Sequence, residues 1–143
     1  MSREFPLLVA DVFEAAGRLR RDGETIAAAE GQTQSRWQVL SVLSGRPMTA
    51  PQAARRLGIS RQAVQRVVNE LVNDALVSSE PNPDHRTSPL LATTDAGRQV
   101  LQHIMDREAE AHRSLDEVIT PEEVTMAREV LQRLNRHLRQ NSD

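Results

Sequence analysis

The chain has 143 residues, of which 38% are hydrophobic and 27% charged, and its formal net charge at pH 7 is -2. This length suits one domain with a real hydrophobic core, and no apolar stretch approaches the length of a membrane span. The absence of cysteine excludes disulfides, thiolate metal sites and cysteine redox chemistry, and two Phe, one Trp and no Tyr are too few to stack single-stranded bases.

The first predicted element is an amphipathic helix over residues 5–21. Leu7 and Phe13 widen its apolar stripe, so it either packs on its own core or also meets a partner chain. Asp22-Gly23 is expected to break the helix before a short turn around Ile26. The stripe consists of Phe5, Leu8, Val9, Val12, Ala16 and Leu19.

A second helix is predicted over residues 34–44, with Thr33 as its cap and residues 45–47 as its end. Leu40, Val42 and Leu43 would contribute to the core. Trp37 is a candidate for lining an effector pocket, although a single Trp on an apolar helix face is more often a core residue.

Residues 48–71 carry the pattern of a helix-turn-helix. Thr49 followed by Gln52 is a capping-box start for a short first helix. Gly58 suits the left-handed conformation that often ends a helix, and Ser60 can cap a second helix. Helices this short need a larger body to hold them. Their apolar residues are Ala53, Ala54 and Leu57 in the first, and Val64, Val67, Val68 and Leu71 in the second.

The second helix of this motif has a polar face turned away from its valines. Arginine matches guanine edges in a major groove, and Gln or Asn matches adenine. Residues 46–66 contain five arginines and no Asp or Glu, which would attract a phosphate backbone. An ordinary solvated helix face is the alternative. The predicted contacts are Gln62, Gln65, Arg66, Asn69, Arg61 and Ser60 toward the bases and groove, and Arg55 and Arg56 toward phosphates.

Two short extended segments follow, over residues 75–80 and 88–92, joined by a polar loop. They predict a β-hairpin wing in which Pro89 requires a sheet edge. Arg86, at the predicted tip, could enter a neighbouring minor groove, and Asp84 would orient the tip or pair with an arginine. The simpler alternative for both residues is an exposed turn with an ion pair worth under about 1 kcal/mol.

Two long helices are predicted at the C-terminal end. Thr94 can cap the first, which we expect to run to about Val118. Residues 120–123, Thr-Pro-Glu-Glu, combine a capping box with proline at the first helical position and start the last helix. These helices have more apolar length than one winged domain requires, so we assign them, with the first helix, to a dimer interface.

The predicted fold class is therefore mainly α, a winged helix-turn-helix with a two-stranded β wing and long N- and C-terminal dimerisation helices. Within a single domain over residues 1–143, we expect an N-terminal dimerisation helix and linker over residues 1–31. The winged DNA-binding part would cover residues 32–93. The C-terminal dimerisation helices would cover residues 94–143.

In this order, the features resemble the MarR family of winged-helix transcriptional regulators over nearly the whole chain. Residues 33–43 are similar to the helix before the reading unit, and residues 53–71 to the helix-turn-helix. Asp84-His85-Arg86 matches the family's Asp-x-Arg wing motif. Residues 93–97, Thr-Thr-Asp-Ala-Gly, resemble the start of the long helix after the wing.

The resemblance implies an obligate homodimer with recognition helices in successive major grooves, Arg86 at the minor groove, and often a small ligand between the dimerisation and DNA-binding parts. Two reading modules about 34 Å apart would fit a palindromic operator. The chain departs from the pattern at Ser79, where many relatives carry a basic residue after the turn that here reads Ala75-Leu76-Val77.

We therefore predict a sequence-specific double-stranded DNA-binding transcriptional regulator, a repressor relieved by a small ligand, located in the cytoplasm because no signal-peptide profile is present. No cofactor is expected. An enzyme is disfavoured, since the four histidines are scattered and the six glycines form no phosphate loop. Glu108 and His112 are spaced for one helical face, but this pair alone predicts no metal site. A winged protein-interaction module without DNA binding is the alternative.

Overall fold

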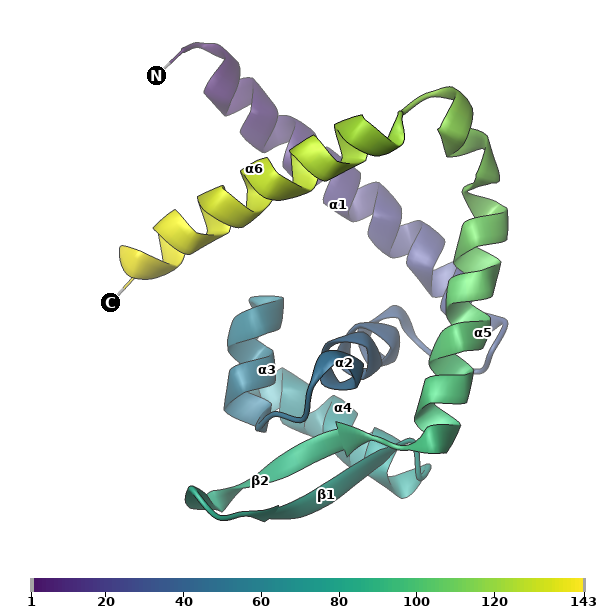
Figure 1. Cartoon of the computed structure of the whole chain (residues 1–143), viewed down its shortest axis with the longest axis vertical. Helices are drawn as coiled ribbons and strands as arrows, with labels where there is room; N and C mark the ends of the chain where they lie inside the picture. The colour runs from purple at the N-terminus through teal and green to yellow at the C-terminus, as the bar shows by residue number, and fades with distance from the viewer. Residues whose placement is uncertain (1, 143) are drawn as a thin grey trace. The chain divides into compact units, whose positions relative to one another are not determined.

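The elements of the computed structural model, which describes residues 2–142, follow the predicted order. Within these residues there are six α-helices and one two-stranded antiparallel sheet (Figure 1), which confirms the predicted fold class. The chain forms two compact units, and the boundary between them follows Glu108. The elements are α1 (Glu4–Ala28), α2 (Gln34–Gly45), α3 (Ala50–Leu57), α4 (Arg61–Asn73), β1 (Val77–Asn82), β2 (His85–Thr93), α5 (Asp95–Ala111), the short 3-10 helix η1 (Arg113–Glu117) and α6 (Pro121–Gln140).

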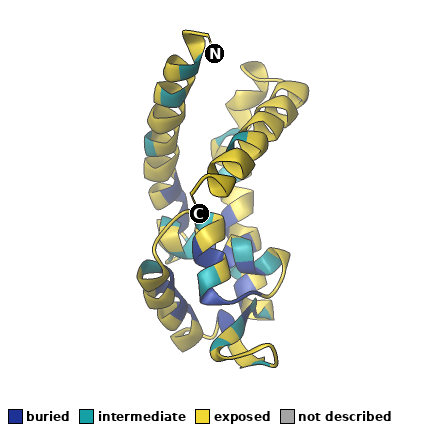
Figure 2. Ribbon diagram, turned by 90° about the vertical axis from the view of Figure 1, so that its left-hand side faces the viewer, coloured by how far each residue is buried: buried dark blue, intermediate teal, exposed yellow. Residues whose placement is uncertain are grey.

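The core of the first unit lies among α2, α3, α4 and the β1–β2 hairpin, which we call the winged unit. Leu40 and Leu43 of α2 are fully buried against Val64, Val68 and Leu71 of α4. Figure 2 shows buried residues, in dark blue, on the inner sides of these elements. Because every predicted apolar position of α4 is buried, the opposite side of α4 is left free.

The first helix is longer than predicted and continues through Gly23, so the predicted break there was wrong. Gly23 is buried, and a Cβ atom on it would lie 2.8 Å from Cγ of Gln34. The glycine therefore allows α1 to approach α2 closely. A glycine inside a helix costs about 1 kcal/mol relative to alanine, which this packing offsets.

The wing extends further toward its tip than predicted. β2 begins at His85, which pairs with Asn82, so only Pro83 and Asp84 form the turn. The ladder is irregular between Glu80 and Asn82, where Pro81 has no N–H to donate. The turn lies at the end of the hairpin farthest from α5 (Figure 1). The predicted polar loop was therefore too long, because exposed strands carry no apolar alternation that would mark their ends.

The same sheet meets the segment before α3 through a single bridge. Met48 and Leu91 exchange two backbone hydrogen bonds of 2.9 and 3.0 Å. The bridge fixes the start of the helix-turn-helix against the wing, and Leu91 is buried beside it.

The long helix after the wing ends at Ala111, short of the predicted Val118. Residues 113–117 form the 3-10 helix, in which Leu115 N–H donates to the His112 carbonyl at 2.9 Å. An i, i+3 spacing of apolar residues, as between Leu115 and Val118, fits both helix types, so the pattern could not signal the change.

The last helix, α6, begins as predicted. Thr120 Oγ1 accepts a bond from Glu123 N–H, and Glu123 Oε2 accepts one from Thr120 N–H. Pro121 occupies the first turn. No described residue of α6 is buried (Figure 2), and the side chain of Met126 is 67% exposed.

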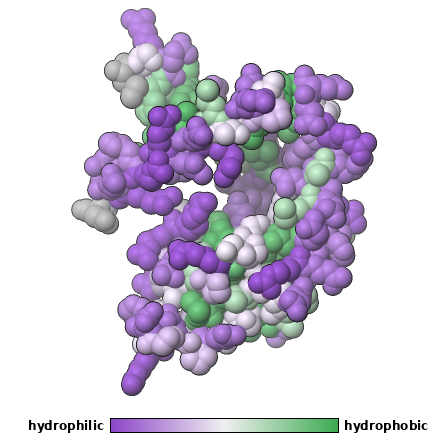
Figure 3. Space-filling view, in the orientation of Figure 1, coloured by the Kyte–Doolittle hydropathy of each residue, from purple (hydrophilic) through white to green (hydrophobic). Residues whose placement is uncertain are grey.

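The N-terminal part of α1 is also apolar and exposed. Phe13 is 74% exposed and Leu7 is 58% exposed. Hydrophobic side chains are visible at the surface along this part of the helix (Figure 3). The apolar stripe of α6 consists of Val124, Ala127, Val130, Leu131, Leu134 and Leu138. The apolar stripes of α1 and α6 each lack a covering surface in the single chain, which is the condition expected of a helix that meets a partner.

Candidate nucleic-acid interface

The first helix of the motif, α3, is held at both ends by local signals. Thr49 and Gln52 form the predicted capping box, with N···O distances of 2.9 and 3.3 Å. At the other end Gly58 has φ 68° and ψ 30°, the left-handed conformation that glycine tolerates. These two ends set the direction of the turn into α4.

The second helix, α4, starts at Ser60 as predicted. Ser60 Oγ accepts a hydrogen bond of 3.1 Å from Ala63 N–H, satisfying one of the free donors of the first turn. The hydroxyl hydrogen remains able to donate to an incoming acceptor.

The other end of α4 is held by Arg36 of α2, a contact that sequence reasoning missed. The Arg36 guanidinium lies 2.5 Å from Asp74 Oδ2 and 3.9 Å from Glu70 Oε2, and its Nε donates to Gln32 Oε1 at 2.7 Å. The Arg36 side chain is only 12% exposed. Since it is 38 residues from Asp74, no local pattern could have indicated the pair.

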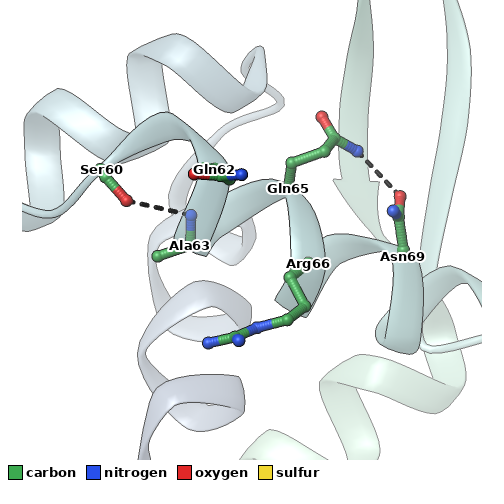
Figure 4. A pocket seen from close by; sticks show the side chains of 6 residues that line it. All are labelled: Ser60, Gln62, Ala63, Gln65, Arg66 and Asn69. Carbon is green, nitrogen blue, oxygen red and sulfur yellow. Dashed lines mark hydrogen bonds between the residues drawn. The ribbon is translucent and has the colours of Figure 1, made fainter.

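The outward side of α4 carries Gln62, Gln65, Arg66 and Asn69, which we call the reading face. All four residues are exposed. They line a shallow hollow of about 530 Å³, shown in Figure 4, together with Ser60 and Ala63. The structure thus brings together five of the six side chains predicted to face the bases and groove, and the sixth, Arg61, lines a neighbouring hollow.

Within the reading face, Gln65 Nε2 donates a hydrogen bond of 2.8 Å to Asn69 Oδ1 (Figure 4). The two residues are one helical turn apart, the spacing at which side chains of a helix meet. The sequence contains this spacing, but the bond itself was not predicted.

The basic residues predicted around the reading face are exposed. Within residues 2–142 none of them takes part in an ion pair, in contrast to Arg36 or Arg107. Because they carry positive charge without a carboxylate partner, they are available to phosphates. They are Arg46, Arg55, Arg56, Arg61, Arg66 and Arg86.

Two further hollows lie between the helix-turn-helix and the wing. One, of about 310 Å³, is lined by Arg61, Gln62 and Gln65 on α4 and by Thr87, Ser88 and Pro89 on β2, with Ala50 and Pro51. The other, of about 380 Å³, is lined by Arg55 on α3 and by Asn82, Asp84, His85 and Ser88 of the wing, with Thr49, Pro51 and Gln52. Arg61 and Arg55 are therefore placed where helix and wing meet. Sequence reasoning missed the wing residues from Thr87 to Pro89.

The tip of the wing is organised by Asn82. Its Oδ1 accepts a hydrogen bond of 3.1 Å from Asp84 N–H, a turn that the short polar side chain of Asn favours. The Asp84 carboxylate has no ion-pair partner among the described residues. Arg86 lies on β2 and not on the tip itself, and it is exposed. Its predicted contact with a minor groove remains a prediction.

Trp37 is half-buried and packs against the core of the winged unit, near Gly23. Its role in an effector pocket remains a prediction.

In the part of the chain that the structure describes, no three His, Asp or Glu side chains are arranged to hold a metal ion. No helix in this part is long and apolar enough to span a bilayer.

The buried valine side of α4, the turn at Gly58 and the β hairpin together define a winged helix-turn-helix protein. Residues 31–86 match the family model of the MarR family. Uncharacterized proteins of Mycobacterium tuberculosis and Mycobacterium bovis are 54% identical over 134 residues, which is 94% of this chain and 94% of theirs. The transcriptional activatory protein BadR of Rhodopseudomonas palustris is 33% identical over 94 residues, 62% of this chain and 53% of BadR.

Solved structures share the fold over almost the whole chain. NadR in complex with 4-hydroxyphenylacetate has a TM-score of 0.81 at 17% identity, covering 94% of this chain and 96% of NadR. A point mutant of MarR from E. coli, complexed with operator DNA, has a TM-score of 0.72 at 17% identity, covering 94% of this chain and 99% of the mutant. Residues 31–86 therefore carry a MarR-family sequence, and the chain shares the fold of solved MarR structures over almost its whole length.

Proposed function

We propose that this protein is a homodimeric, sequence-specific double-stranded DNA-binding transcriptional regulator that acts as a repressor and is released by a small ligand. The observation that carries the proposal is the reading face of α4. This face is polar and exposed, and arginines without an ion-pair partner lie beside it. The opposite side of the same helix is buried in the core.

The side chains of this face suit the edges of duplex bases. In the major groove, Arg66 would contact guanine O6 and N7, while the amides of Gln62, Gln65 and Asn69 would select adenine. Replacing Arg66 with alanine should then cost about 1–3 kcal/mol of operator binding and relax selectivity at one base pair. Uniform weakening on all sequences would instead assign Arg66 to a phosphate.

The remaining arginines would contact the backbone. Arg55 and Arg56 lie in the last turn of α3 and are exposed, a position suited to phosphates beside the groove. Losing one of them should reduce the slope of log affinity against log salt by about one unit. Arg61, on the hollow between α4 and β2, would fix the register, and Arg86 would reach the adjacent minor groove.

We assign dimerisation to α1, α5 and α6. One reading module buries only about 600–1,000 Å² on DNA, usually too little for tight specific binding, whereas two modules about 34 Å apart read two half-sites of a palindrome. The exposed apolar stripes of α1 and α6 are the surfaces available for pairing two chains. A regulator that binds operators of the genome would act in the cytoplasm.

The ligand response is supported by the shared fold. NadR, with the same fold, was solved in complex with 4-hydroxyphenylacetate. For this chain we propose that a small ligand changes the separation of the two α4 helices, so that both can no longer dock on one operator. Saturating ligand that left operator affinity unchanged would contradict this mechanism.

A binding titration tests the proposal. Fluorescence anisotropy would be measured with a duplex from upstream of the chain's own coding sequence and with a scrambled duplex of equal length, at two salt concentrations. We expect weaker binding at higher salt on both duplexes and a preference for the upstream duplex at both salts. No preference for any sequence at either salt would favour the alternative, a winged protein-interaction module.

The direction of regulation needs its own readout. BadR carries the name of a transcriptional activatory protein, whereas we propose repression here. In transcription with purified RNA polymerase, the protein should lower the yield from a promoter that overlaps the operator. An increased yield would leave the DNA-binding function intact but reverse its sign.

A further inference from the structure

The hydrogen bond between Gln65 and Asn69 has a consequence for the bases that the reading face selects. The two amides are exposed on adjacent turns of α4, and the bond of 2.8 Å runs from Gln65 Nε2 to Asn69 Oδ1. In Figure 4 the Gln65 carbonyl oxygen points away from Asn69. The orientation of the Gln65 amide is therefore coupled to that of Asn69, because Gln65 cannot turn over alone and keep this bond.

The donors and acceptors that remain decide what this orientation can read. A glutamine amide has two N–H donors and one carbonyl acceptor. Gln65 uses one N–H on Asn69 and keeps the other N–H together with its oxygen. Adenine offers an acceptor at N7 and a donor at N6 in the major groove, so it complements one N–H and one oxygen.

Guanine is rejected by the same arrangement. It offers two acceptors, N7 and O6, and would require Gln65 to present both N–H groups. Turning over the Gln65 amide alone would place its oxygen against Asn69 Oδ1, two acceptors without a hydrogen between them, so reading guanine requires the Asn69 amide to turn over as well. Breaking the bond to read guanine would leave Asn69 Oδ1 without this donor in a groove from which water is partly excluded.

We propose that Gln65 and Asn69 act as one adenine-reading unit, in which Gln65 contacts adenine N6 and N7 and Asn69 is a positioning residue that fixes the Gln65 amide. This inference rests on the proposed function, because it presupposes that α4 enters the major groove. It goes further by coupling one base of the half-site to a residue pair instead of to single side chains.

The experiment separates the two ideas. Wild-type protein would first be used to select duplexes from a random library, which establishes whether a specific operator exists. Each adenine of the selected half-site would then be replaced by guanine, and anisotropy would give the ratio of affinities for wild type, Asn69→Leu and Asn69→Asp. Asn73→Leu, in the last turn of the same helix, is the matched control, since Asn73 is exposed and receives no bond from Gln65.

At one position the wild type and Asn73→Leu should prefer adenine over guanine by about tenfold or more, the discrimination expected of a good bidentate pair. Asn69→Leu removes the acceptor, so the preference at that position should fall below about threefold, because the amide can then turn over. Asn69→Asp keeps an acceptor and should retain the adenine preference, although its negative charge weakens binding on every duplex.

Selection of no sequence by the wild type would overturn the proposed function, and this inference with it. A selected operator whose adenine preferences are all unchanged in Asn69→Leu would overturn this inference alone. Preference for guanine at the position that responds to Asn69→Leu would do so as well.

Discussion

At the scale of single residues, Ala75 stands out as the one residue other than glycine with a positive φ in the part of the chain that the structure describes. It follows the C-terminus of α4 and has φ 59°, a left-handed conformation that costs a residue with a Cβ about 1–2 kcal/mol. Its N–H still donates to the Val72 carbonyl at 3.0 Å, as helix ends of this kind require. Glycine is the residue that adopts this conformation without strain.

Ala75→Gly should therefore stabilise the protein, by up to about 1 kcal/mol after the greater freedom of glycine in the unfolded chain is counted. The same change at Ala10, an exposed position inside α1, should destabilise it by about 1 kcal/mol. Urea unfolding of both variants at equal protein concentration shows whether each change raises or lowers the free energy of unfolding. A destabilised Ala75→Gly protein would contradict the strain assigned to Ala75.

Gly97 shows the opposite situation, a glycine required by a close approach. A Cβ on Gly97 would overlap the Leu76 carbonyl oxygen and lie 2.7 Å from Thr93 Cγ2. Thr94 holds the same junction, because its hydroxyl donates to the Ala75 carbonyl at 2.8 Å and accepts from Gly97 N–H at 3.1 Å. The start of α5 is thereby fixed to the turn between α4 and β1.

Gly97→Ala should lower the free energy of unfolding by about 2 kcal/mol or more, because the backbone of Leu76 must move. Gly45, at the end of α2, is the matched control, since nothing lies within 4 Å of its Cβ position. Gly45→Ala should change stability by less than about 1 kcal/mol. Thermal melts in which both variants lost the same stability would refute the close approach at Gly97.

At the scale of elements, the orientation of α4 depends on its attachment to α2. The buried valines and leucines hold α4 against the core of the winged unit, while Arg36 holds its C-terminal end through Asp74 and Glu70. Arg36 also neutralises two carboxylates that lie at the C-terminal end of α4, the negative end of its helix dipole.

Arg36→Met keeps the length of the side chain and removes these bonds. We expect a loss of about 1.5–3 kcal/mol of stability, the range for hydrogen bonds to charged groups, and weaker binding on all duplexes without a change in base preference. Arg98→Met breaks an exposed ion pair of 3.6 Å with Asp95 and should cost less than about 1 kcal/mol. Urea unfolding would decide the point, and equal losses for the two variants would show that Arg36 is no more than another surface arginine.

Also at this scale, the elements that could be predicted were those with local signals. The capping boxes at Thr49 and Thr120 and the glycine at position 58 mark ends through residues only a few positions apart, and the structure has these ends. The continuation of α1 through Gly23 could not be predicted, because it depends on the distant Gln34.

The candidate site also contains both kinds of feature, those that local patterns predict and those that depend on distant residues. Helical periodicity was sufficient to place Gln62, Arg66 and Asn69 on one exposed face, since the valines of α4 occupy the other. The Arg36 contact with Asp74 and the wing residues that line the hollow beside Arg61 depend on tertiary packing. Hydrophobic patterns carry no information about such polar contacts.

At the scale of the whole molecule, two copies of the chain are needed to place two reading faces on one operator. The apolar stripe of α6 includes Leu131, which is exposed in the single chain. A dimer would bury this stripe, and a buried charge without a partner costs several kcal/mol.

Leu131→Glu should therefore raise the dimer dissociation constant by about 100-fold or more, measured by sedimentation equilibrium. Gln132→Glu introduces the same charge on the side of α6 away from the stripe and should leave the constant within a few-fold of the wild type. A monomeric wild type, or an unchanged constant in Leu131→Glu, would contradict the assignment of α6 to the dimer interface.

The central claim is that the reading face of α4 contacts base edges in the major groove. Dimethyl sulfate methylates guanine at N7, an atom exposed in that groove, so protection of N7 reports contact there. With DNA saturated by protein, we expect one guanine N7 in each half-site to be protected by the wild type and to become reactive with Arg66→Ala. No protected guanine at saturation, or the same protection with Arg66→Ala, would contradict the claim.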